Sequence, residues 1–242
     1  MSVTSAVDQK VQLAVSTVVF ALRPHPTTGR ATLWLPLVRR IREPYEGQWA
    51  LPGGPLQPHE DLVASAQHTL EEITDLQPRY LEQLYSFGAV DRSPAAEVDG
   101  RVVSIVYWAL VRPDEAERAV AKTDVSGENV EWFVADTFVE GDELGRVPAL
   151  AFDHNRIVQY ALDRLRAKIT YSPIAHAFLP DEFTLAELRE VHEAVLRKTL
   201  DPANFRRQVL ATEAFEPTGR CVQGTNHRPP ALYRFKPRKE SP

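Results

Sequence analysis

The amino-acid sequence predicts an α/β (α+β) sandwich over residues 1–170, followed by a winged helix-turn-helix domain over residues 171–242. Short β-rich segments separated by turn residues fill most of the first part. Two predicted helices joined by a very short turn lie near residue 200, and a Gly- and Pro-containing segment with β-rich ends follows them. The end of the chain is also basic, whereas the rest is acidic.

Length and composition exclude several classes of protein. A chain of 242 residues can form one large domain or two ordinary ones. Its 43% hydrophobic and 25% charged content is typical of a soluble globular protein. No apolar run is long enough to cross a membrane, and residues 1–10 lack a signal-peptide core. The single cysteine, Cys221, excludes an internal disulfide and fits a reducing compartment, so we expect a cytoplasmic protein without a membrane partner.

The elements of the first domain follow from periodicity. Helices are predicted over residues 60–73 and 153–169, where apolar residues recur on one face. Turn signals occur at Gly53-Gly54, among other places. The expected strands cover residues 11–22, 31–38, 80–87, 101–111 and 130–134.

Residues 54–76 resemble a Nudix box, written G-x5-E-x7-R-E-U-x-E-E-x-G-U with U an aliphatic residue. The resemblance implies a helix whose glutamates hold divalent metal ions, which polarise a phosphate and activate water. Here the R-E pair is His68-Thr69, Ile73 replaces the second E of the E-E pair, and Asp75 replaces the late glycine. Only Glu60 and Glu72 remain in register.

Three glutamates spaced i, i+3 and i+4 would share one helix face, but these positions hold Thr69, Glu72 and Ile73. One carboxylate is a poor site for a hard dication. Glu71 points about a quarter turn away. We therefore expect no metal site and no catalytic residue, with Glu60 and Glu72 vestigial or simply solvated. A one-residue slip in the alignment would still leave no R-E pair.

The second domain begins with a capping box, Thr184-Leu-Ala-Glu187, which opens a helix that we expect to end at Leu200. Asp201-Pro202 then caps a second helix, with proline at its first position. Residues 215–235 fit a two-stranded wing. A small helical substrate domain is the alternative interpretation.

Charge supports the helix-turn-helix. Residues 201–242 hold eight basic and four acidic residues, a net charge of +4 in a chain whose total is −5. An acidic body with a basic end is typical of an attached nucleic-acid-binding module, although a solvated basic tail gives the same count. Arginine can pair with guanine edges or phosphates, and asparagine with adenine. The expected DNA-binding residues are Asn204, Arg206, Arg207, Gln208, Arg228, Lys236 and Arg238.

Four longer segments resemble one family. They read YLEQLYSFG at residues 80–88, FTLAEL at 183–188, LDPANFRR at 200–207 and HRPPALYRF at 227–235. They are similar to the Nudix-related transcriptional regulators of NAD metabolism, the NrtR family, over about residues 11–235. Residues 93–100 are less alike.

The resemblance implies a catalytically decayed Nudix domain that senses ADP-ribose or a related NAD metabolite and requires no cofactor. It also implies a winged helix that represses NAD biosynthesis or salvage genes, and a homodimer on a palindromic double-stranded operator. Two other functions remain open: an ADP-ribose pyrophosphatase with an added C-terminal module, and a dinucleotide sensor that acts through protein contacts without DNA.

A pyrophosphate ligand needs cations or backbone N–H groups, and an adenine needs an aromatic platform. Such residues flank the box, although each arginine can equally be a surface residue or an ion-pair partner, and Trp49 a core residue. The expected ligand-binding residues are Arg39, Arg40, Arg42, Trp49, Gly53, Gly54 and Arg92.

Overall fold

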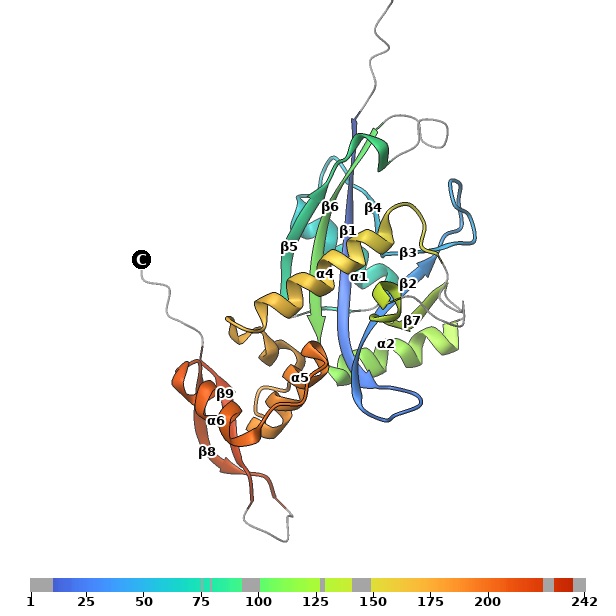
Figure 1. The fold of residues 1–242 in the computed structure, drawn as a ribbon. Coiled ribbons are helices and arrows are strands. Elements are labelled where there is room, and N and C mark those ends of the chain that lie inside the picture. The colour runs from blue at the N-terminus through green and yellow to red at the C-terminus, as the bar shows by residue number, and fades with distance from the viewer. Residues whose placement is uncertain are drawn as a thin grey trace, which may run out of the picture.

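Figure 1 shows a mixed sheet covered by helices on both faces, with a smaller helical domain and a two-stranded ribbon beneath it. The structure is a computed structural model. It describes residues 11–74, 76–78, 80–92, 101–126, 129–140, 149–223 and 229–236, and the side chains of all these except 120–126 and 140.

The large sheet has the order β3-β2-β1-β6-β5, and β4 also pairs with β1 while β7 pairs with β2. Strands β1 and β6 run parallel over their full overlap, and the other pairs are antiparallel. The strands are β1 (Val11–Pro24), β2 (Ala31–Arg39), β3 (Trp49–Ala50), β4 (Gly53–Pro55), β5 (Tyr80–Phe87), β6 (Arg101–Val111) and β7 (Val130–Val134).

Alternation along β1 assigns the two faces of the sheet. Val18, Phe20 and Leu22 belong to the cluster that includes the buried side of α4 (His154–Lys168). Val19 and Ala21 point the other way, toward α1 (Leu62–Thr74) and α2 (Pro113–Ser126). The sheet is therefore the middle layer of a sandwich, with α4 on one face and the box helix α1 on the other (Figure 1).

The C-terminal domain contains α5 (Leu185–Leu196), α6 (Pro202–Ala211), β8 (Phe215–Cys221) and β9 (Ala231–Phe235). The predicted capping box is present: Glu187 N–H donates to Thr184 Oγ1, and Thr184 N–H donates to the Glu187 carboxylate. At α6, Asp201 Oδ1 accepts a hydrogen bond from the Asn204 N–H. The short 3₁₀ helices η1 (Val90–Arg92) and η2 (Pro173–Phe178) and the one-turn α3 (Thr137–Glu140) complete the elements.

Two local predictions are wrong. Helix α5 ends at Leu196, not at Leu200, because Arg197 adopts the left-handed conformation with φ 53° and ends the hydrogen-bond series. Gly53-Gly54 forms strand β4, not a turn. A Cβ on Gly53 would lie 2.7 Å from both Val15 O and Ser16 Oγ, so the glycine is required by the close approach of β1.

The two domains share one hydrophobic core. A single cluster runs from Phe20 and Trp108 in the sheet, through Leu162 of α4, to Leu188 of α5 and Phe215 of the ribbon. The C-terminal domain is thus packed against the sheet domain rather than tethered by an extended linker.

Among the residues that the structure describes, no helix has the length and apolar character needed to cross a bilayer.

The glycine pair in β4 provides a matched test of the packing. Gly53→Ala should lower the free energy of unfolding by about 1–3 kcal/mol, because the backbone of β1 must move to accept the methyl group. Gly54→Ala should change it by less than about 1 kcal/mol, since nothing lies within 4 Å of a Cβ built there. Urea denaturation of both variants measures the difference, and equal stabilities would contradict this account of β4.

Candidate ligand cavity and nucleic-acid interface

The two glutamates left from the box have different surroundings. Glu60 has a side chain 14% exposed and pairs with His68 Nδ1 at 2.8 Å. This hydrogen bond raises the pKa of His68 above its usual value. Glu72 is 72% exposed and lies 3.9 Å from His68 Nε2. The residue at the box arginine position therefore contacts both glutamates.

These residues do not fit a hard divalent cation. Thr69 and Ile73 are half-buried on α1 and offer no carboxylate, and Glu60 is already paired. Within the described ranges, no three His, Cys, Asp or Glu side chains converge as metal ligands would.

A cavity of about 280 Å³ lies at the N-terminal end of α4, on the face of the sheet opposite the box helix. The positive end of the helix dipole and the exposed Arg156 favour an anion. The lining carboxylates of Asp91 and Asp153 oppose it, and Asp153 pairs with Arg92. The lining residues are Tyr45, Asp91, Arg92, Phe152, Asp153 and Arg156.

The structure places the predicted ligand residue Arg92 at this cavity, but its guanidinium is largely engaged within the protein. Nε and Nη2 donate to both oxygens of Asp153 at 3.0 and 2.7 Å. Nη1 donates to Ser104 Oγ at 2.8 Å and to the Phe87 carbonyl at 3.1 Å. With a side chain only 5% exposed, Arg92 holds the start of α4 against β5 and β6.

Arg40 also reaches this region from the segment after β2. Its guanidinium carbon lies 4.7 Å from the centre of the Phe152 ring, and burial lowers its pKa. Tyr45 packs edge-on against the same ring, with centroids 4.8 Å apart. Arg156, in the first turn of α4, is exposed and forms no ion pair with any residue that the structure describes.

The sequence did not single out Phe152, Asp153 or Arg156 for ligand binding. The available signal was their position at the start of the helix predicted over residues 153–169, where anions bind readily.

The structure does not bring the other predicted ligand residues to the cavity lining. Arg39 is exposed and donates to the Gly47 carbonyl, and Arg42 is exposed nearby. Trp49 is half-buried and packs edge-on against Phe133 at 5.2 Å, as a residue at the margin of the core. Gly53 and Gly54 lie in β4 on the edge beside the box helix.

The predicted recognition helix α6 has its expected orientation. Phe205 and Val209 are buried, whereas Asn204, Arg207 and Gln208 are exposed. Arg207 Nη2 donates to Asn204 Oδ1 at 2.5 Å, which aligns the two side chains on the outer face. Arg206, also exposed, donates to the Tyr233 hydroxyl at 3.5 Å.

The ribbon formed by β8 and β9 has the place of a wing beside α6 (Figure 1). Arg220 and Arg234 in this ribbon pair with Glu182 and Glu216, so part of its positive charge is compensated. Lys236 is exposed at the end of β9. The predicted contacts Arg228 and Arg238 lie outside the described residues.

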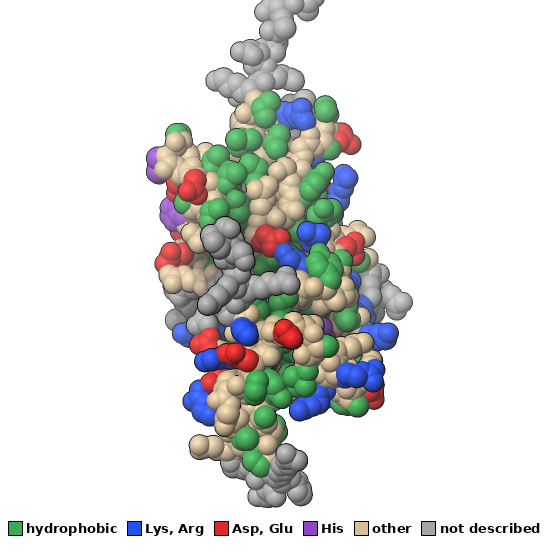
Figure 2. Space-filling view, turned by 90° about the vertical axis from the view of Figure 1, so that its left-hand side faces the viewer, with side chains coloured by type: hydrophobic (Ala, Val, Ile, Leu, Met, Phe, Trp, Pro, Cys, Tyr) green, Lys and Arg blue, Asp and Glu red, His purple; other side chains and the backbone are tan. Residues whose placement is uncertain are grey.

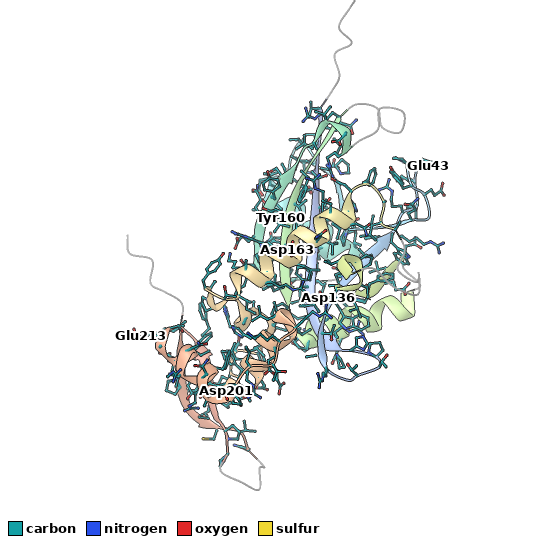
Figure 3. All side chains as sticks on the ribbon, viewed as in Figure 1. Glu43, Asp136, Tyr160, Asp163, Asp201 and Glu213 are labelled. Carbon is teal, nitrogen blue, oxygen red and sulfur yellow. The ribbon has the colours of Figure 1, made fainter. Side chains whose placement is uncertain are left out.

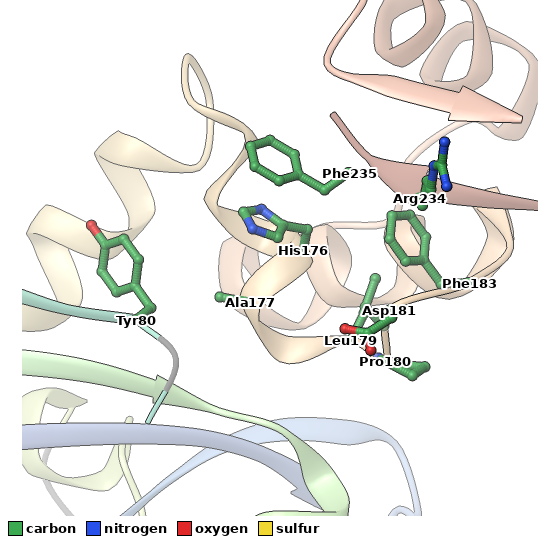
Figure 4. A pocket seen from close by; sticks show the side chains of 9 residues that line it. All are labelled: Tyr80, His176, Ala177, Leu179, Pro180, Asp181, Phe183, Arg234 and Phe235. Atoms are coloured by element: carbon green, nitrogen blue, oxygen red, sulfur yellow. The ribbon is translucent and has the colours of Figure 1, made fainter. Parts of the chain in front are cut away.

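A second cavity, of about 320 Å³, lies between the sheet domain and the ribbon (Figure 4). The His176 and Phe235 rings stack beside it with centroids 3.8 Å apart, and Arg234 on its rim is paired with Glu216. Burial lowers the pKa of His176, which favours the neutral ring. This cavity is larger than that at α4. Its arginine, Arg234, is already paired with Glu216, whereas Arg156 at the α4 cavity is exposed.

Comparisons with known proteins match both domains. Residues 13–160 match the NUDIX domain, and residues 175–235 match the NrtR DNA-binding winged helix domain. The chain belongs to the NrtR family. The predicted order of a Nudix sandwich and a C-terminal winged helix-turn-helix is confirmed.

Individual relatives of this NrtR-family chain agree. The ADPR responsive transcriptional repressor NtrR of Acinetobacter baylyi is 32% identical over 86% of this chain and 78% of its own. The crystal structure of Shewanella oneidensis NrtR complexed with a 27mer DNA superimposes with a TM-score of 0.75 and 31% identity, covering 93% of each chain. An ADP-ribose pyrophosphatase of Methanocaldococcus jannaschii is 29% identical over 51% of this chain and 62% of its own.

The buried first residue of α4, His154, generates a pH prediction. His154 Nδ1 accepts the Leu51 N–H at 3.0 Å, and burial lowers the pKa of His154 to about 4. Because the unfolded chain binds this proton near pH 6.5, the stability due to neutral His154 is complete above that pH and is lost as the pH falls toward 4.

Between pH 7 and pH 4.5, the parent should therefore lose about 2 kcal/mol more unfolding free energy than His154→Asn, whose Oδ1 can accept in the place of Nδ1 but does not titrate. Urea denaturation at the two pH values measures this. Parallel losses in the two proteins would contradict the assignment of a buried neutral ring.

Proposed function

We propose that this chain is a DNA-binding repressor whose Nudix domain senses ADP-ribose and does not hydrolyse it. The observation that carries the proposal is the likeness over 93% of the chain to an NrtR crystallised on DNA, joined to a helix α6 with Asn204 and Arg207 on its exposed face. The likeness to an ADPR-responsive repressor supports ADP-ribose as the effector.

The cavity at α4 is our candidate for the phosphate-binding part of the effector site. Arg40 and Arg156 bring positive charge to the N-terminal end of the helix. Arg92 is paired with Asp153 there, and Tyr45 and Phe152 offer aromatic rings. A whole ADP-ribose molecule is larger than this cavity of about 280 Å³, so the part of the ligand outside the cavity would extend along the surface. Arg39, Arg42, Trp49, Gly53 and Gly54 stay candidate contacts for that remainder.

The family resemblance also suggests the regulated genes, the cellular location and the effect of ADP-ribose. We infer that the regulated genes serve NAD biosynthesis or salvage, that the protein works in the cytoplasm, and that ADP-ribose releases the operator. We place the domain division at 170/171, directly after α4, because α4 belongs to the sheet domain and η2 to the next.

An ADP-ribose pyrophosphatase is the second candidate, and the likeness to an archaeal enzyme over half of the chain supports it. Against it stand Thr69 and Ile73 at two of the three metal positions and the pairing of Glu60 with His68.

One experiment separates the two candidates. The full chain is incubated with ADP-ribose and Mg²⁺ or Mn²⁺, and AMP is quantified. We expect no enzymatic release of AMP. In parallel, ADP-ribose should weaken binding to operator DNA from upstream of NAD genes by about 5- to 150-fold, whereas NAD and nicotinamide mononucleotide serve as comparison ligands. Robust AMP formation, or an effect below about twofold with ADP-ribose bound by calorimetry, would overturn the proposal.

The recognition-helix assignment has its own test. Arg207→Ala should cost about 1–3 kcal/mol of operator binding and relax specificity at one position, because we propose that its exposed guanidinium on α6 reads a base. Lys236→Ala should weaken binding to all sequences alike and lower the salt dependence, because we propose that this exposed side chain contacts phosphate. Fluorescence anisotropy against operator and scrambled DNA measures both. Parental operator affinity in Arg206→Ala/Arg207→Ala would show that α6 does not read DNA.

We further propose a homodimer, since two-fold operators match two-fold proteins. Exposed apolar side chains suggest one surface: the rings of Tyr85 (53% exposed) and Tyr160 (40%) lie 5.2 Å apart between centroids, and Val11 and Leu13 are also exposed. Figure 2 shows hydrophobic side chains gathered on the upper part of one face.

Light scattering at micromolar concentration should give a dimer, and Tyr85→Glu/Tyr160→Glu should shift it toward monomer. A monomeric parent, free and with DNA, would be evidence against the dimer.

A further inference from the structure

Asp136 lies near the junction of the two domains (Figure 3). It follows β7 and precedes α3, so its backbone belongs to the sheet domain. One carboxylate oxygen accepts a hydrogen bond from Arg166 Nη2 of α4, and the other lies 3.7 Å from Nε of Arg197. The carboxylate side chain is only 11% exposed. One buried negative charge is therefore shared by two arginines from different elements.

Both arginines act on the end of α5. Arg166 Nε donates to the Val195 carbonyl at 3.1 Å, one of the last carbonyls of the helix, which lack partners within it. Positive charge at this end also complements the helix dipole. Arg197 is the C-cap of α5 and the first residue of the turn that leads to α6. Asp136 thus connects β7 and α4 to the turn of the helix-turn-helix.

We propose that Asp136 is a positioning residue for DNA recognition, which fixes the turn between α5 and α6 to the sheet domain. A displacement of α4 produced at its N-terminal end then alters the orientation of α6 through Arg166 and Asp136. This inference rests on the proposed function, because it assigns the connection between the effector cavity and the recognition helix. A ligand shifts DNA affinity only if such an element differs between the two states.

Substituting Asp136 alone should be enough to loosen this junction. Removing one partner of a buried ion pair leaves the other charge uncompensated, whereas exposed pairs contribute little. Asp136→Asn removes the charge with almost no change of shape. Asp163→Asn is the matched control, because Asp163 is exposed on α4 (Figure 3) and forms no hydrogen bond or ion pair with other described residues. Arg197→Gln, at the half-exposed partner, is the second variant if Asp136→Asn folds poorly.

The first measurement is amide hydrogen exchange of the full chain without DNA or ADP-ribose. The last turn of α5 and residues 197–200 should exchange at least about fivefold faster in Asp136→Asn and in Arg197→Gln, and at the parental rate in Asp163→Asn. Parental rates in both test variants would overturn the proposal.

The second measurement is the effect of ADP-ribose on operator affinity. In Asp136→Asn, the fold-change should fall to less than about a third of the parental value, while ADP-ribose binds within about twofold of the parent by calorimetry. An unchanged fold-change, or a matching loss of ADP-ribose binding, would overturn the coupling role. If the parent itself does not respond to ADP-ribose, the proposed function fails, and the exchange rates alone decide whether Asp136 positions the turn.

Discussion

Helix α4 is held along its whole length, and the arrangement of both domains depends on this. Its apolar side packs into the core that extends from the sheet to α5. At its start, Asp153 binds the buried Arg92. At its end, Arg166 binds Asp136, and Lys168 binds Glu82 while lying 5.6 Å from the centres of the Tyr80 and Trp108 rings. A helix anchored at both ends moves as a rigid body rather than by bending.

The box residues and the candidate ligand cavity lie on opposite faces of the sheet. The box helix α1 lies on one face of the sheet with a histidine tied to Glu60, whereas the cavity with its arginines lies on the face of α4. A hydrolase needs phosphate and metal-binding glutamates at one place. A sensor needs only a ligand-dependent contact with an element that reaches the DNA-binding domain, and α4 is the element that we propose for this role.

The sequence predicts the strands β5, β6 and β7 and the caps of α5 and α6 correctly, because their signals are local. It does not predict that Gly53 forms a strand, since that depends on the approach of β1, which is distant in the sequence. It leaves open whether Arg92 binds a ligand or pairs with a carboxylate. The engagement of Arg92 by Asp153, 61 residues away, depends on tertiary structure. Phe152 and Arg156 were not predicted, although their position at the start of a predicted helix was a signal.

We propose that a ligand bound at the start of α4 changes the distance between the two α6 helices of the dimer. Cys221 is the only cysteine of the chain and is exposed in the wing, so one spin label per protomer reports the distance between wings in the proposed dimer. Double electron–electron resonance between the two labels should show that ADP-ribose shifts this distance by a few ångströms. A shift on that order is typical of a rigid-body rearrangement at an interface. An identical distance distribution with saturating ADP-ribose, in a dimer whose operator binding ADP-ribose weakens, would contradict the account.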